Sequence, residues 1–331
     1  MDRLLQGLRA AGEATRLRIL GLCGHAELSV TELVEILDQS QPRISRHLRL
    51  LVEAGLLHRH QEGNWAYYRL GEAAASGELA RLLVDLMPAD DPFHAQDLAR
   101  LVRVKEAWAV KAAADFKNHA PEWSRLNAEL YDDRRIDAAL VERLGAAPLG
   151  DLLDIGTGTG HTLRVLGGKA DRGVGIDRSI DMLRVARANL WRAGLKNCQV
   201  RLADMLRLPY PPDRFDTVTL CMVLHLAESP AAAVAEAARV LRPGGRLVVV
   251  DLAPHDRAGL RRDRGHRWMG FADHELRGLF EHGGLVAEAP QRLDGGPLAV
   301  CLWLAKRPAN DARQSQAAGQ GGRQGAGQTA G

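Results

Sequence analysis

The stretch Leu152-Leu153-Asp154-Ile155-Gly156-Thr157-Gly158-Thr159-Gly160 predicts a short buried strand that runs into a glycine-rich turn. Glycine is needed where the backbone turns sharply and approaches a ligand closely, because a Cβ would clash there. The spacing differs from the dinucleotide-binding pattern G-x-G-x-x-G, whose third glycine would fall on His161. The stretch therefore predicts a ligand-binding loop at the end of a strand, without the dinucleotide fingerprint.

Strands and helices alternate after Pro148, which predicts a parallel sheet covered by helices on both faces. Asp177 ends a second strand about 20 residues beyond the loop, where a carboxylate can accept both hydroxyls of a ribose. The further strands are expected at residues 200–203, which end in Asp204-Met205, at 215–220 and within 241–250. The carboxy-terminal half is thus predicted to be an α/β domain that binds an adenosine-containing ligand.

The pattern D-x-G-x-G-x-G at residues 154–160 resembles motif I of class I S-adenosylmethionine-dependent methyltransferases, and the likeness covers about residues 148–305. The resemblance implies a Rossmann-like fold with S-adenosylmethionine or S-adenosylhomocysteine as ligand. It also implies roles for individual residues. Asp154 would help to hold the amino group, Asp177 would bind the ribose, and Asp204 with Met205 would bracket adenine. The glycines beside the methionine portion would be Gly156, Gly158 and Gly160. For Asp204 the plain alternative is a cap at a strand end, and for Met205 it is core packing.

The amino-terminal half contains Gln41-Pro42-Arg43-Ile44-Ser45-Arg46-His47-Leu48-Arg49-Leu50-Leu51. Its apolar residues recur at i, i+4 and i+7, which predicts a helix with one buried face. Arg46 and Arg49 fall on the opposite side of the helix, and Arg43 flanks them. The same exposed face carries Gln41, Ser45 and His47. Arg59 lies on a hairpin predicted at residues 57–61 and 65–70. Such side chains can contact phosphates and base edges in a major groove. The alternative is an arginine-rich face that is merely solvated.

The run Ser-x-His-Leu-x-x-Leu-x-x-Ala-Gly-Leu from Ser45 to Leu56 resembles the winged helix of the ArsR family, and the likeness covers about residues 10–71. The resemblance implies binding to double-stranded operator DNA as a homodimer. Many metal-sensing members carry Glu-Leu-Cys-Val-Cys-Asp-Leu where this chain has Glu27-Leu28-Ser29-Val30-Thr31-Glu32-Leu33. Hydroxyls are poor ligands for soft metals, so no metal site is predicted.

An apolar stripe is expected to form the seam of that dimer. Its members are Leu4, Leu5, Leu8, Leu79, Leu82, Leu83 and Leu86.

Composition limits the class of protein. The formal net charge of the 331 residues is only +3, so any DNA-binding surface must be a local patch. The four cysteines show no C-x-x-C spacing, and no apolar run approaches the ~18 residues of a membrane span, which favours a cytoplasmic protein without a membrane partner.

Four regions are predicted: a winged helix-turn-helix DNA-binding domain at 1–88, a linker and helical segment at 89–145, a Rossmann-like class I methyltransferase domain at 146–307 and a disordered tail at 308–331. The tail consists mainly of Ala, Gly, Gln and Ser, which cannot offset the entropy cost of ordering.

Two functions remain open at this stage. The leading hypothesis is a transcriptional repressor whose operator affinity responds to S-adenosylmethionine or S-adenosylhomocysteine. The alternative is an active small-molecule methyltransferase with an autoregulatory winged helix, for which His225 is the candidate general base. A lone histidine is more often structural, so whether the chain is an enzyme stays undecided. A third possibility, an enzyme whose winged helix only dimerises, is weakened by the arginine-rich face.

Overall fold

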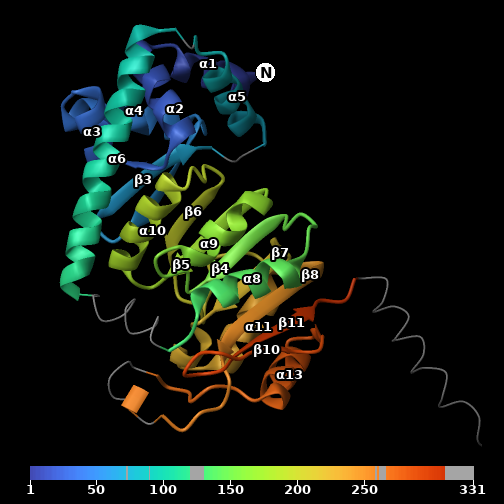
Figure 1. Cartoon of the computed structure of the whole chain (residues 1–331). Helices are drawn as coiled ribbons and strands as arrows, with labels where there is room; N and C mark the ends of the chain where they lie inside the picture. Colours follow the sequence, from blue (N-terminus) through green and yellow to red (C-terminus); the bar gives the residue numbers. More distant parts are fainter. Residues whose placement is uncertain (72–73, 89, 120–129, 258, 261–265, 310–331) are drawn as a thin grey trace, which may run out of the picture. The chain divides into compact units, whose positions relative to one another are not determined.

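The polypeptide folds as two units in a computed structural model (Figure 1). The structure describes residues 1–71, 74–88, 90–119, 130–257, 259–260 and 266–309, so the predicted tail lies outside the described residues from residue 310 onward. The first unit contains Met1–Asp115 and Arg187–Gln199, and the second contains Phe116–Ala186 and Val200–Gly331. The first unit thus extends beyond residue 88.

The first unit combines helices with a small antiparallel sheet. Its elements are α1 (Asp2–Ala11), α2 (Ala14–His25), β1 (Leu28–Ser29), α3 (Val30–Leu37), α4 (Gln41–Glu53), β2 (Leu57–Glu62), β3 (Trp65–Leu70), α5 (Ala74–Asp85) and the larger part of α6 (Pro92–His119). The strand order is β1-β3-β2. A capping box begins α3, in which the Ser29 hydroxyl accepts from the Glu32 N–H and the Glu32 carboxylate accepts from the Ser29 N–H.

Helix α4 buries one face in the core of this unit. Ile44, Leu48 and Leu51 are fully buried, and Arg43, Arg46 and Arg49 are all exposed. The predicted periodicity is therefore confirmed. Because α3 and α4 follow each other and the β2–β3 hairpin comes next, the order of elements is helix, turn, helix and hairpin.

The second unit contains a large mixed sheet. Its elements are α8 (Asp133–Leu144), β4 (Asp151–Ile155), α9 (His161–Leu166), η1 (Gly167–Lys169), β5 (Arg172–Asp177), α10 (Ile180–Arg192), β6 (Cys198–Leu202), β7 (Phe215–Cys221), η2 (Leu224–Leu226), α11 (Pro230–Val240), β8 (Leu241–Leu252), α13 (Asp273–His282), β9 (Val286–Ala287), β10 (Gln291–Leu293) and β11 (Val300–Lys306). The division between the units falls within α10, after Ala186, and within β6, after Gln199.

The sheet has the strand order β10-β11-β8-β7-β4-β5-β6, and β9 pairs with β11. Strands β5, β4, β7 and β8 run parallel, whereas β11 is antiparallel to β8. The predicted α/β fold, with an amino-terminal helix-turn-helix and a carboxy-terminal Rossmann-like domain, is confirmed.

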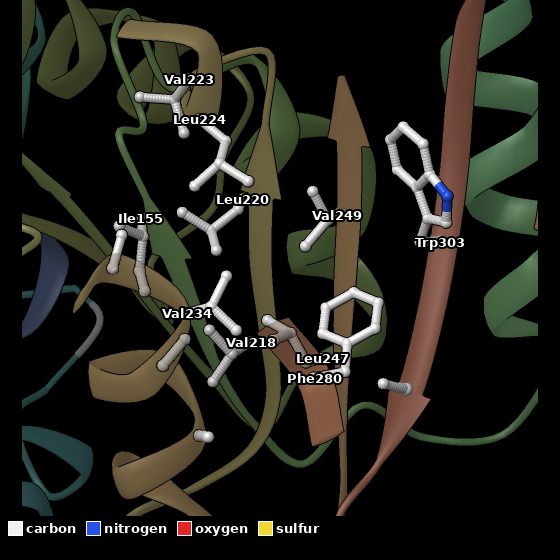
Figure 2. Close-up of a cluster of buried hydrophobic side chains, with 14 of the residues drawn as sticks. Ile155, Val218, Leu220, Val223, Leu224, Val234, Leu247, Val249, Phe280 and Trp303 are labelled. Atoms are coloured by element: carbon white, nitrogen blue, oxygen red, sulfur yellow. The ribbon is translucent and has the colours of Figure 1, made fainter. Parts of the chain in front are cut away.

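Helices α11 and α13 cover one face of the sheet around a buried apolar cluster (Figure 2). Val234 of α11 and Phe280 of α13 are fully buried in this cluster with Val218, Leu247 and Val249 of the central strands. The dense packing of such a core resists changes in volume. This core fixes the strands whose ends form the site described below.

The parallel register places the carboxyl ends of the central strands at one edge. Ile155 of β4 pairs with Ile176 of β5 and with Leu220 of β7, and Leu220 pairs with Val249 of β8. The residues that follow these strands therefore emerge together, which is the usual place for a ligand in an open α/β sheet.

No helix among the described residues is long and apolar enough to span a membrane. The four cysteines, all of which lie in the described part of the chain, form no disulfide.

Two leucines of α4 provide a matched test of this packing. Leu48 is 0% exposed and Leu50 is 36% exposed. We expect Leu48→Ala to lower the free energy of unfolding by about 2 to 5 kcal/mol, because it leaves a cavity, and Leu50→Ala to cost less than about 1 kcal/mol. Urea denaturation followed by circular dichroism measures both. Equal losses for the two variants would contradict the assigned burial.

Candidate functional site

The loop after β4 adopts a backbone that favours glycine. Gly156 and Gly158 have φ angles of 71° and 52°, both in the left-handed region. A Cβ on Gly156 would lie 2.3 Å from Val223 Cγ2, whereas a Cβ on Gly158 would meet no atom within 4 Å. Gly156 thus allows the loop to pack against the segment after β7, and Gly158 borders open space. Gly160, the third predicted glycine, precedes α9 with a φ of 78°.

Asp177 holds the loop in place from the end of β5. Its Oδ2 accepts from the Gly158 N–H at 2.9 Å, and its Oδ1 accepts from the Ser179 N–H at 2.8 Å. A carboxylate has about four acceptor positions, so capacity for further hydroxyl donors remains. This geometry is compatible with the predicted ribose contact.

Asp154 is a buried acid with unused acceptor capacity. Its side chain is 1% exposed, and Oδ1 accepts from the Thr219 hydroxyl at 2.7 Å. Oδ2 is buried, and no described residue forms a hydrogen bond with it. Burial raises the pKa of Asp154 to about 6, an effect that outweighs the lowering by the nearby Thr157 and Thr219 hydroxyls. An ammonium group at this position would provide the missing donor, so the site fits the amino group of an adenosyl amino acid.

The two residues predicted to surround adenine have structural roles here. Asp204 is exposed, and its Oδ1 accepts from the Leu206 N–H at 2.9 Å, which caps the turn after β6. Met205 is partly buried against the hydrophobic core. The plain alternatives for both residues are therefore observed, and the adenine contact stays a prediction.

His225 lies in η2 after β7, and its partner is Asp251 at the end of β8. His225 Nδ1 is 2.8 Å from Asp251 Oδ1, and the two side chains are 5% and 0% exposed. The sequence analysis did not identify Asp251. The only signal for it was a carboxylate at the end of the apolar run Val248-Val249-Val250, which is the same pattern that marked Asp177. Thr219, the hydroxyl donor to Asp154, was also not predicted.

The predicted DNA-reading side chains of the first unit are mostly exposed. Those on the surface of α4 and β2 are Gln41, Arg43, Ser45, Arg46, Arg49 and Arg59. His47 differs from the prediction, because its side chain is only 12% exposed and its Nδ1 lies 3.5 Å from Glu13 Oε2. Burial lowers the pKa of His47, so the imidazole packs within the unit as an uncharged group at neutral pH.

Among the described residues, no group of three or more His, Cys, Asp or Glu side chains is arranged to hold a metal ion.

Comparisons with protein families assign both parts of the chain. Residues 153–249 match the family model described as a methyltransferase domain, and residues 11–60 match one described as a helix-turn-helix domain. The chain joins a helix-turn-helix domain to a methyltransferase domain. The helix-turn-helix match contains α4, and the methyltransferase match contains β5, β7 and the last part of β4 with the loops that follow these strands.

Curated relatives cover part of this chain. The chain is 31% identical over 137 residues to YcgJ of Bacillus subtilis, described as an uncharacterized methyltransferase, covering 39% of this chain and 54% of the relative. It is 32% identical over 197 residues to a 37.1 kDa protein in transposon TN4556 of Streptomyces fradiae, covering 55% and 56%. It is 37% identical over 146 residues to demethylmenaquinone methyltransferase of Deinococcus radiodurans, covering 42% and 59%. The chain thus spans little more than half the length of these relatives.

Solved structures were also compared. YcgJ of Bacillus subtilis superposes with a TM-score of 0.48 at 19% identity, over 54% of this chain and 100% of that chain. The N-methyltransferase NodS of Bradyrhizobium japonicum, in complex with S-adenosylhomocysteine, gives a TM-score of 0.47 at 22% identity, over 61% and 98%.

The pKa of Asp154 predicts how stability depends on pH. Its folded value of about 6 lies above the ordinary value of 3.8, so the folded state binds more protons between these two values. The free energy of unfolding should therefore fall as the pH rises from about 4 to about 6, by about 3 kcal/mol for this group. Asp154→Asn should remove that part of the slope.

Urea denaturation at several pH values measures this effect. Asp171→Asn, at an exposed position, is the matched control and should keep the slope of the unsubstituted chain. An Asp154→Asn variant with the same pH dependence as the control would refute the assignment.

Proposed function

We propose that this chain is a DNA-binding transcriptional repressor of the ArsR kind, whose operator affinity depends on S-adenosylmethionine or S-adenosylhomocysteine bound by its methyltransferase domain. The observation that carries the proposal is one chain with two binding surfaces: the exposed arginine-rich face of α4, and the loop after β4 with a buried carboxylate oxygen that has no donor among the described residues.

The DNA-binding surface in this proposal comprises α4 and the β2–β3 hairpin. Arg43, Arg46 and Arg49 project from the side of α4 opposite its buried leucines, so the helix can enter a major groove while its core contacts stay intact. Arg59 on β2 is exposed as well and is suited to a backbone phosphate. His47 is excluded from the readout set because it contacts Glu13.

The ligand-binding surface uses the residues at the carboxyl edge of the sheet. Asp154 accepts from the amino group, Gly158 gives the methionine portion room, and Asp177 accepts from the ribose hydroxyls, in addition to its bonds to the loop. Asp204 is exposed at the end of β6, where it is able to contact an adenine ring.

A second copy of the chain is the proposed partner for an apolar surface on α1 and α5. Leu4, Leu5, Leu8, Leu82 and Leu86 are exposed there. The two helices approach closely at Gly7, where a Cβ would lie 2.6 Å from Leu79 Cδ2. Leu79 and Leu83 of the predicted seam pack onto the core of the unit instead. A two-fold dimer places its reading helices about 34 Å apart, which matches a palindromic operator.

The second candidate function is methyl transfer to a small molecule. The observation that favours it is the His225–Asp251 pair, because a histidine oriented by a buried carboxylate is an arrangement suited to a general base. Both functions use the same adenosyl ligand, so they are compatible in one chain.

A mobility-shift titration tests the repressor proposal. The probe is a duplex that carries the promoter region of the chain's own gene, and S-adenosylhomocysteine and S-adenosylmethionine are added separately. We expect at least one ligand to change the affinity for this duplex by about 5- to 150-fold, which corresponds to a coupling of about 1 to 3 kcal/mol. Unchanged affinity with both saturating ligands would reject the coupling.

In the same assay, the salt dependence of DNA affinity shows whether α4 contacts the DNA phosphates. Arg46→Ala should weaken binding and reduce the slope of log affinity against log salt by about 0.9, because one phosphate contact is lost. Arg277→Ala on α13, which is also exposed, is the matched control and should leave the slope unchanged. Equal slopes for the two variants would place the DNA contact elsewhere.

A further inference from the structure

We infer that the His225–Asp251 pair, together with the aromatic segment that carries His266 and Trp268, forms an acceptor site that removes the proton from a hydroxyl on an aromatic ring. The inference rests on the second candidate function and assigns its substrate class. His225 is the catalytic residue in this site, and Asp251 is the positioning residue that acts through it.

Asp251 is surrounded by hydrogen-bond donors. Its Oδ2 accepts from the N–H groups of Leu224 at 2.9 Å and His225 at 3.2 Å, and its Oδ1 accepts from the Leu252 N–H at 2.7 Å. Because Asp251 accepts from three backbone N–H groups, we assign the proton between His225 Nδ1 and Asp251 Oδ1, 2.8 Å apart, to the imidazole. The lone pair of a neutral His225 is therefore on Nε2, which forms no hydrogen bond with any residue the structure describes.

The segment before α13 is hydrogen-bonded to the backbone of His225. The N–H groups of Arg267 and Trp268 donate to the His225 carbonyl at 2.9 and 3.1 Å, and Trp268 Nε1 donates to the Ala227 carbonyl at 3.0 Å. The His266 ring centroid lies 4.3 Å from that of His225. Because these bonds fix the backbone of residues 267–268 on η2, the His266 ring stays beside the His225 ring.

The aromatic surface at this point is partly open. Trp268 stacks on Phe271 with ring centroids 6.1 Å apart, and 42% of Trp268 remains exposed. An exposed indole on the segment that is hydrogen-bonded to His225 is suited to stack on a second aromatic ring. His255, whose ring lies 6.5 Å from that of His266, has its pKa lowered mainly by burial, so it adds no positive charge at neutral pH. His255 therefore provides no positive charge that would favour an anionic acceptor over a neutral one.

The base lies at the edge of the sheet that carries the glycine loop. Val223, two residues before His225, is the side chain that a Cβ on Gly156 would strike. When S-adenosylmethionine is bound, the sulfur–methyl bond breaks with its electron pair remaining on sulfur, the oxygen–methyl bond forms, and the hydroxyl proton passes to His225 Nε2. A positioned base contributes about 10²- to 10⁴-fold to such a step.

The absorbance of 4-nitrophenol tests proton removal without any methyl donor. The probe is titrated with the full chain in a buffer about one pH unit below its own pKa, where the free phenol is mostly protonated. We expect bound 4-nitrophenol to show the absorbance of its anion, and His225→Gln and Asp251→Asn to abolish this change. His274→Gln, at an exposed position of α13, is the matched control and should behave as the unsubstituted chain. Absence of the anion with the unsubstituted chain would overturn the inference.

Transfer of a labelled methyl group provides the second measurement. His225→Gln and Asp251→Asn should lower transfer to phenol by about 100-fold or more. With 4-nitrophenol at alkaline pH the acceptor is already ionised, so the same substitutions should lower transfer by less than about tenfold. Equal losses for both acceptors would show a merely structural role and would overturn the inference. Calorimetry with S-adenosylhomocysteine checks that each variant is folded. Absence of heat with the unsubstituted chain would count against the proposed function, whereas the absorbance test judges the base independently.

Discussion

The parallel register of β5, β4, β7 and β8 is the constraint on which the carboxy-terminal site depends. It brings the ends of four strands to one edge, and each end contributes one functional element: Asp177, the glycine loop, the His225 turn and Asp251. The contact between Gly156 and Val223 joins two of these elements so closely that no Cβ fits between them. The candidate ligand-binding residues and a candidate base are consequently placed at one edge by the buried core below it rather than by the loops alone.

Two buried acids at this edge differ in a way that assigns them different roles. Asp251 accepts hydrogen bonds from backbone N–H groups on both oxygens and lies 2.8 Å from the His225 imidazole, which suits it to orient His225. Asp154 has one oxygen without a donor among the described residues, and burial raises its pKa to about 6. Such a group gains most from a cationic ligand, because the ligand would supply the missing donor and stabilise the charge. The first acid is suited to positioning, and the second to binding.

Local patterns predicted much of this molecule. The buried face of α4 follows from the spacing of Ile44, Leu48 and Leu51, and the strand ends follow from short apolar runs before Gly156 and Asp177. Contacts between distant residues were not predictable in the same way. His47 contacts Glu13, and His225 meets Asp251, which is 26 residues further along the chain. The exposure of Asp204 likewise depends on how the turn after β6 folds, which periodicity does not determine.

The account joins DNA reading and ligand binding in one chain, and ligand binding is the step that everything else requires. Calorimetric titration of S-adenosylhomocysteine into the full chain measures it most directly, with Asp177→Ala compared to Asp171→Ala at an exposed position. The account predicts saturable heat with one site per chain, unchanged in Asp171→Ala and weakened at least about tenfold in Asp177→Ala, since the latter loses hydrogen bonds to a charged group. A folded sample that gives no heat, or two variants that bind equally well, would contradict it.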